Sequence, residues 1–293
     1  MQKTKFDFGL LIILFITIVF SFLMYGDVML HPDMYMFSNT GDGIKNYFTF
    51  AWHVRYDESW IAFSGSNYPY GEHVGYSDGH SLLSLLFGGF DFVKEHPIGF
   101  LNSIMIYSPI FASSVLYKVL RRLDVSMWVA IVGAFCILLM QPQLVRMTGH
   151  YSLSYSWVIP LFILLFLIFQ KSNRVLQIVI YSAYITAIFF IHPYLGMGLA
   201  LFACCVWLVQ IIVAKWKKEP ANFSLLLGGV VSVIFYAAFS KITDTHLDRY
   251  PLLPKDFWNI NLLFSRFFYP ITEALNRYST MKISIGKVLL MLD

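Results

Sequence analysis

Charged side chains are scarce in this sequence. Asp, Glu, Lys and Arg make up 13% of its 293 residues, whereas soluble domains carry about 25%. Hydrophobic residues reach 58%, above the about 45–50% of soluble domains. These two departures exclude an ordinary soluble domain and indicate an integral membrane protein. The net charge of +4 is small for this length and gives no reason to expect a nucleic-acid partner.

Cysteine and the common nucleotide motifs are also scarce or missing. The three cysteines, Cys136, Cys204 and Cys205, lie in apolar runs, which predicts small buried hydrophobes rather than a disulfide framework. The sequence has no Walker loop, Rossmann glycine fingerprint, Gly-x-Ser-x-Gly elbow or His-Glu-x-x-His motif. Soluble nucleotide chemistry is therefore not expected.

What the sequence has in abundance is long apolar runs. Seven of them reach the about 17–25 residues that a helix needs to cross a bilayer. They cover residues 8–25, 98–119, 125–145, 153–169, 175–191, 195–213 and 223–239. The first is longer than the about 7–15 residues of a signal-peptide core and lacks a small-residue cleavage pattern. The sequence thus predicts an all-α integral membrane protein with about seven transmembrane helices, the first of them uncleaved.

The basic residues predict the orientation of these helices. With the N-terminus in the cytoplasm, every short inner connection is basic, as the positive-inside rule requires. The outer side then holds all eight histidines and all acidic residues except Asp7, Asp124 and Glu219. We therefore expect a multi-pass protein of the cell inner (plasma) membrane, with most titratable groups on the extracytoplasmic side.

The first outer connection, residues 26–97, is too long for a simple linker. Loops of this length are usually functional or disordered, and the aromatic content of this one argues against disorder. Residues 44–56 have apolar side chains at helical spacing, and residues 81–90 are too short to span. The first predicts an interfacial helix, and the second predicts an interfacial or re-entrant helix. We expect a transmembrane module over residues 1–240, and we interpret residues 241–293 as the truncated start of another outer segment.

Asp42 is the leading candidate for chemistry, because it lies between two glycines soon after the first span. Gly41 and Gly43 allow unusual dihedral angles and close approach of a ligand. Asp42 could instead simply cap a helix that starts near Ile44. Lys45 lies one turn further on, where it could pair with Asp42 or with a phosphate.

A second cluster lies in residues 67–83. Glu72, His73, Asp78 and His80 could act as acid, base or ligands of a divalent metal, although their spacing matches no standard zinc motif. Asp78 could instead cap the following helix. Tyr68 and Tyr70 flank Pro69 and could either stack on a sugar or anchor the loop at the membrane interface.

The remaining candidates lie beside predicted helix ends. Arg146 and His150 precede the fourth span, where a cation suits a lipid phosphate but could also merely snorkel to the interface. His192 precedes Pro193 in a short turn, where it could bind substrate or form only a polar helix end.

The arrangement of one span, a long outer loop and short basic inner connections resembles the GT-C superfamily of membrane glycosyltransferases. It resembles more narrowly bacterial multi-pass proteins that share three short motifs. Here the motifs are Gly41-Asp42-Gly43, then Tyr68-Pro69-Tyr70-Gly71 with Tyr76 and Asp78, and then Gly149-His150 with Trp157, Pro160 and Leu161. The resemblance covers most of residues 1–240.

The resemblance implies a function. GT-C enzymes move a sugar from a polyprenyl-phosphate carrier to an acceptor on the outer side, with an acidic residue of the first outer loop as catalytic base. That role falls on Asp42, with Asp78 as the second candidate. The implied partners are a lipid-linked sugar, a cell-envelope glycan, lipid or protein acceptor, and membrane lipid. Two other functions stay open: a transporter or flippase of a lipid-linked glycan, and a non-catalytic membrane subunit.

Overall fold

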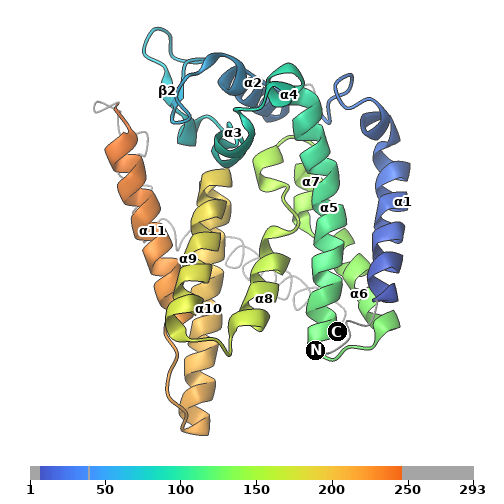
Figure 1. Cartoon of the computed structure of the whole chain (residues 1–293), viewed down its shortest axis with the longest axis vertical. Coiled ribbons are helices and arrows are strands. Elements are labelled where there is room, and N and C mark those ends of the chain that lie inside the picture. The colour runs from blue at the N-terminus through green and yellow to red at the C-terminus, as the bar shows by residue number, and fades with distance from the viewer. Residues whose placement is uncertain (1–6, 39, 246–293) are drawn as a thin grey trace, which may run out of the picture. The chain divides into compact units, whose positions relative to one another are not determined.

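The computed structural model describes residues 7–38 and 40–245, and its secondary structure is mostly helical (Figure 1). Within these residues, seven segments are long and apolar enough to cross a membrane, which confirms the predicted fold class. Five of them are single helices: α1 (Phe8–Leu30), α5 (Pro97–Arg122), α9 (Arg174–Ile191), α10 (Pro193–Lys217) and α11 (Ser224–Thr243).

The third and fourth spans are each built from two pieces. Helices α6 (Met127–Leu139) and α7 (Pro142–Arg146) form the third, and the 3-10 turn η2 (Tyr151–Leu153) and α8 (Val158–Phe169) form the fourth. The 13 residues of α6 extend about 20 Å at about 1.5 Å per residue, short of the about 30 Å hydrocarbon core. The prediction of a continuous helix over 125–145 and over 153–169 is thus wrong in detail, although both segments are candidate spans.

The break after α6 has a local cause. Pro142 is the first residue of α7 and brings no N–H of its own to a helix, and Gln141 before it is extended with φ −72° and ψ 128°. The break leaves irregular backbone between α6 and α8, and this backbone carries His150. Non-helical backbone at membrane depth is tolerated where protein covers it or where it lines a cavity.

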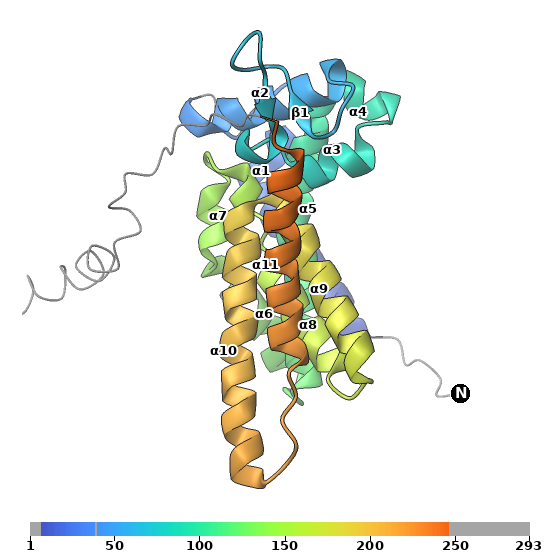
Figure 2. The same ribbon diagram turned by 90° about the vertical axis from the view of Figure 1, so that its left-hand side faces the viewer.

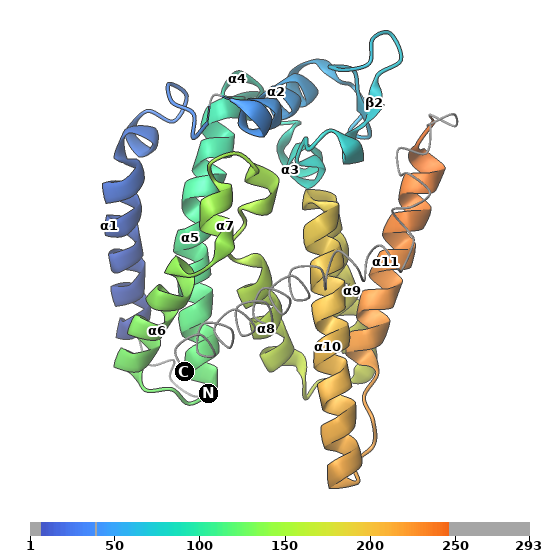
Figure 3. The ribbon, with the colours of Figure 1, turned by 180° about the vertical axis from the view of Figure 1, so that it is seen from behind.

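The basic connections gather at one end of the helices. Arg121 and Arg122 close α5, Arg174 begins α9, and Lys215 and Lys217 close α10. Figures 1 and 3 show these helix ends together, opposite the segment that joins α1 to α5. We call the two sides the basic end and the loop end, the loop end being the side of residues 31–96.

The loop end is a folded layer rather than a linker. It contains α2 (Gly41–Tyr56), a hairpin of β1 (Ala62–Phe63) and β2 (Glu72–His73), the turn η1 (Val74–Tyr76), α3 (Ser81–Phe87) and α4 (Asp91–Glu95). Figure 2 shows these elements lying across the ends of the long helices. The helices expected near 44–56 and 81–90 are therefore present as α2 and α3.

Polar and aromatic contacts fix α2 to the spans. The Tyr47 hydroxyl donates to Oδ1 of Asn102 on α5, and Nδ2 of Asn102 donates to the carbonyl oxygens of Pro32 and Tyr35 at 2.6 and 2.7 Å. The buried Phe50 ring stacks on Phe100 with 5.8 Å between centroids. Because these contacts join three chain segments in the core, the start of α2 has a defined position above α5.

Two further expectations change, and a third lies mostly outside the described residues. Cys136 and Cys205 are exposed on the surfaces of α6 and α10 instead of buried. Helix α1 extends to Leu30 and therefore includes Asp27, which the sequence placed in the first outer connection. Helix α11 ends at Thr243, and residues 246–293 of the predicted C-terminal segment, with His246, lie outside the described residues.

Candidate functional site

Asp42 lies in the first turn of α2, at the loop end. Gly41 takes φ +54°, and Thr40 is the N-cap residue, without a side-chain hydrogen bond. Asp42 is therefore not the helix cap that the sequence allowed. Its side chain is 54% exposed, and its carboxylate lies at the positive end of the α2 dipole, which stabilises negative charge.

The partner of Asp42 comes from the irregular backbone after α7. His150 Nδ1 lies 3.6 Å from Asp42 Oδ2, and the His150 backbone N–H donates to the Arg146 carbonyl at 2.9 Å. The Arg146 side chain is exposed, and among the described residues its guanidinium has no ion-pair or hydrogen-bond partner. The broken third span therefore brings His150 to Asp42 and places a free cation one turn before it.

Asp78 forms the centre of a second group. Lys45 Nζ lies 2.9 Å from Asp78 Oδ2, and His192 Nε2 lies 3.4 Å from Asp78 Oδ1. Lys45 thus pairs with Asp78 rather than with Asp42. Nδ1 of His192 accepts the N–H of Tyr194 at 3.1 Å, so the ring proton sits on Nε2 and is donated to Asp78.

These contacts determine the protonation state of Asp78. The His192 hydrogen bond and the Lys45 ammonium hold the pKa of the Asp78 carboxyl well below its usual range, although partial burial opposes the shift. Asp78 does not cap α3, because His80 is the N-cap residue there. It links α2 to the α9–α10 junction.

His80 is buried beside this group. Its backbone is left-handed with φ 51°, and its Nδ1 lies 2.8 Å from the Tyr155 hydroxyl. Burial is the main cause that lowers the pKa of His80 to about 3, with the Asp78 carboxylate opposing the shift and the neighbouring His192 adding to it. His80 is therefore neutral at physiological pH and is part of the core.

The other predicted residues of the loop lie on and beside the hairpin. His73 is buried, accepts the Gly75 N–H at 3.1 Å, and lies 2.9 Å from the Thr243 hydroxyl at the end of α11. Glu72 Oε2 accepts from Asn67 at 3.1 Å. Tyr68 and Tyr70 are 92% and 82% exposed. Both tyrosines are thus open to a ligand or to the membrane interface.

Among the described residues, no group of three or more His, Cys, Asp or Glu side chains is placed to hold a metal ion. The predicted divalent metal thus has no ligand set in that part of the chain.

Sequence reasoning missed one pair. His53 Nδ1 lies 2.9 Å from Asp57 Oδ2, and their side chains are only 1% and 4% exposed. Residues four apart on a helix lie on one face. The spacing of His53 and Asp57 at the end of the predicted helix could therefore have indicated the pair.

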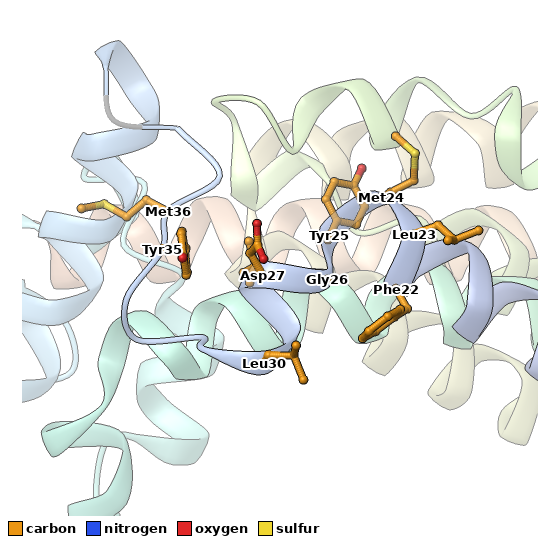
Figure 4. A pocket seen from close by; sticks show the side chains of 10 residues that line it. Phe22, Leu23, Met24, Tyr25, Gly26, Asp27, Leu30, Tyr35 and Met36 are labelled. Atoms are coloured by element: carbon orange, nitrogen blue, oxygen red, sulfur yellow. The ribbon is translucent and has the colours of Figure 1, made fainter.

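A cavity of about 460 Å³ lies at the break in α1, where Tyr25 has non-helical dihedral angles. Figure 4 shows the Asp27 carboxylate between Tyr25 of α1 and Tyr35 of the following segment. Apolar side chains such as Phe22 and Leu23 complete the lining, and both are exposed on the surface of α1. The cavity thus combines an apolar wall with one carboxylate.

The comparisons with known proteins identify a family. Residues 14–277 match the family described as "Domain of unknown function (DUF6311)", so the chain belongs to that family. No curated protein matches the chain, and no solved structure matches it.

Proposed function

We propose that this member of the DUF6311 family is a GT-C-like membrane glycosyltransferase with Asp42 as its general base. It moves a sugar from a polyprenyl-phosphate carrier to a hydroxyl of a cell-envelope glycan, lipid or protein. The observation that carries the proposal is the contrast between two carboxylates at the loop end. Asp78 is paired with Lys45 and His192, whereas Asp42 is half-exposed and, among the described residues, pairs only with His150 at 3.6 Å.

The contrast supports Asp42 as the base. A general base works best when its pKa lies near the operating pH and when it can reach the proton that it takes. The hydrogen bond from His192 and the Lys45 ammonium stabilise the ionised form of Asp78 and lower its basicity. Within the described part of the chain, His150 is the one ion-pair partner of Asp42, and the exposed side chain is open to an acceptor hydroxyl.

Every proton and bond in the proposed reaction is accounted for by the acceptor, the donor and Asp42. The acceptor O–H gives its proton to Asp42 while its oxygen forms a bond to the anomeric carbon. The bond from that carbon to the phosphate oxygen breaks, and the electron pair leaves with the polyprenyl phosphate. Attack opposite the leaving group inverts the anomeric configuration. Cations aimed at the phosphate stabilise the charge that develops there.

Arg146 is the cation proposed for the phosphate. Its guanidinium is exposed, and among residues 7–38 and 40–245 it has no partner. A planar guanidinium binds phosphate in bidentate fashion. The cavity at the break in α1 has the apolar wall that an isoprenoid chain requires, and we propose it as the path of the lipid tail.

The Arg146→Ala protein is expected to need about tenfold more lipid-linked donor for half-maximal transfer, because a phosphate loses a charge-assisted partner worth at least about 1.5 kcal/mol. Turnover at saturating donor should change much less. The measurement is transfer rate against donor concentration in reconstituted membranes. Arg174→Ala, at the basic end, is the matched control. An unchanged donor requirement in Arg146→Ala would remove Arg146 from the donor site.

We propose that the loop end faces the extracytoplasmic side of the cell inner (plasma) membrane, with the N-terminus in the cytoplasm. The clustering of the arginines and lysines at the basic end supports this orientation. Isoprenoid-linked sugars used in the cell envelope are consumed on that side in the GT-C enzymes that the sequence resembles.

Cysteine labelling tests the orientation. In a background without Cys136, Cys204 and Cys205, a cysteine at position 66 should react with an impermeant thiol reagent in intact cells. One at position 172, in the α8–α9 connection, should react only after the cells are opened. The reverse pattern would move the candidate site to the cytoplasm.

A transporter or flippase of a lipid-linked glycan is the second candidate. The interrupted third span and the carboxylate of Asp27 within α1 favour it, since transporters often use broken helices and ionisable groups in spans. Purification of the protein followed by mass spectrometry should identify a bound lipid-linked sugar under either function. Formation of a new glycosidic bond in a reconstituted assay distinguishes the enzyme.

A further inference from the structure

A second cavity lies at the far end of α2 from Asp42. Its volume is about 730 Å³, and residues of α2, α3 and α4 and of the segment after α2 line it. The lining includes His53, Asp57, Trp60, Ser84, Gly89 and Lys94. The eleven residues from Asp42 to His53 correspond to about 16 Å along a helix at about 1.5 Å per residue. The cavity is therefore separate from the Asp42 site.

His53 is held in one tautomer. Asp57 Oδ2 lies 2.9 Å from His53 Nδ1, and Asp57 Oδ1 accepts the backbone N–H of Ser64 at 3.1 Å and the Ser64 hydroxyl. An ionised carboxylate only accepts hydrogen bonds, so Nδ1 carries a proton, and in the neutral ring Nε2 then carries the lone pair. A carboxylate partner fixes both the tautomer and the ring orientation of a histidine.

The lone pair on Nε2 is unsatisfied by the protein. Nε2 of His53 is buried and has no hydrogen-bond partner within the described part of the chain. A buried acceptor without a partner costs about 1–3 kcal/mol. Nε2 is closed to solvent in this structure, so a water or a ligand hydroxyl reaches it only when neighbouring side chains shift. A water occupies only about 30 Å³, whereas the cavity has the size of small-molecule sites, which are about 300–1,000 Å³.

The charges around the cavity favour a neutral ligand. Arg55 and Lys94 are balanced by Asp57 and Glu58. The Arg55 guanidinium is also occupied, because it donates to the carbonyl oxygens of Lys94 and Glu95 at 2.6 and 3.0 Å. A phosphate would need uncompensated cations or free N–H groups. A hydroxyl group instead supplies the donor that Nε2 lacks, and it can also accept from Lys94.

We propose that this cavity is a binding site for a neutral ligand with several hydroxyl groups, of the saccharide class. His53 Nε2 accepts a hydrogen bond from one hydroxyl, and Trp60 forms an aromatic wall. The site binds and does not transfer, so it does not depend on the role of Asp42.

The test is saturation-transfer NMR on the whole chain in lipid nanodiscs, which avoids sugar-based detergents. The probes are maltotriose and N,N′-diacetylchitobiose, with glucose 6-phosphate as the charged comparison. At least one neutral probe should bind saturably, and His53→Phe should weaken that binding at least tenfold. No saturable binding of either neutral probe to the wild-type protein would mean that water alone satisfies His53, and equal or tighter binding of glucose 6-phosphate would contradict the neutral class.

A second variant distinguishes a loss of binding from misfolding of the His53→Phe protein. A Cβ atom at Gly89 meets no atom within 4 Å, so Gly89→Leu should add bulk to the cavity without strain in the fold. It should weaken binding as His53→Phe does. Gly198→Leu on α10 is the matched control, since a Cβ there also meets nothing, and it should bind like wild type.

The Asp42→Asn protein separates the two proposals, and it should bind the probe normally whatever its turnover. Loss of binding in Asp42→Asn, or normal binding in both cavity variants, would overturn the assignment.

Discussion

The Asp42→Asn protein is expected to transfer sugar about 10²–10⁴-fold more slowly than the wild type at saturating donor, the range typical of a lost general base. Asparagine keeps the size of the side chain but cannot take a proton at neutral pH. Asp42 does not cap α2, so the substitution removes no capping bond. Its side chain is 54% exposed, and expression and membrane insertion should therefore stay normal.

A matched control comes from α4. Asp91 lies in the first turn of that helix, as Asp42 lies in the first turn of α2, and its side chain is also exposed. Asp91→Asn should thus reproduce any general effect on a helix N-terminus while leaving transfer near the wild-type rate. Near-normal turnover in Asp42→Asn would end the case for Asp42 as the base, and Asp78 would then be the next carboxylate to test.

The sequence predicted the parts of this molecule that follow from local pattern. Apolar runs of sufficient length predicted the seven spans. The basic residues predicted that Arg121 and Lys215 lie at the same end of the helices. Helical periodicity after Asp42 correctly placed α2. Each of these features is decided within about twenty residues of chain, where composition and spacing carry the information.

Tertiary pairing could not be predicted in the same way. Asp78 meets Lys45 and His192, which are 33 and 114 positions away in the chain, and nothing in the local sequence of Lys45 distinguishes a pair with Asp78 from a pair with Asp42. The break at Pro142 was missed for a different reason: mean hydropathy does not report backbone hydrogen bonding, although a proline within an apolar run is itself a signal for a helix break.

His80 gives the loop end a dependence on acid. Asp78 and His192 lie near it, Tyr155 hydrogen-bonds its Nδ1, and its Nε2 is buried without a partner among the described residues. Its folded pKa of about 3 lies below the about 6.5 of an unfolded histidine. Between these values the unfolded chain binds a proton that the folded chain does not. Stability must therefore fall as the pH falls through this window.

Lowering the pH from 7.5 to 5 should consequently reduce the free energy of unfolding by about 2 kcal/mol through His80 alone, since each pH unit below about 6.5 contributes about 1.4 kcal/mol. Asp78 does not change the free energy of unfolding in this window. Its pKa is lowered in the folded protein, so the stability that it contributes is lost only below about pH 4. The measurement is chemical unfolding of the protein in detergent at several pH values.

The comparison for this measurement is the His80→Asn protein. Asparagine tolerates the left-handed backbone at position 80, where φ is 51°, better than most residues do, and it does not titrate. His80→Asn should be less stable than wild type at pH 7.5, because the Tyr155 hydroxyl loses its imidazole partner. Its stability should nevertheless fall less steeply with acid, so the two curves converge near pH 5. Parallel curves would show that the imidazole of His80 takes up its proton in the folded protein as readily as in the unfolded chain. Water would then reach the side chain, and burial would not lower its pKa.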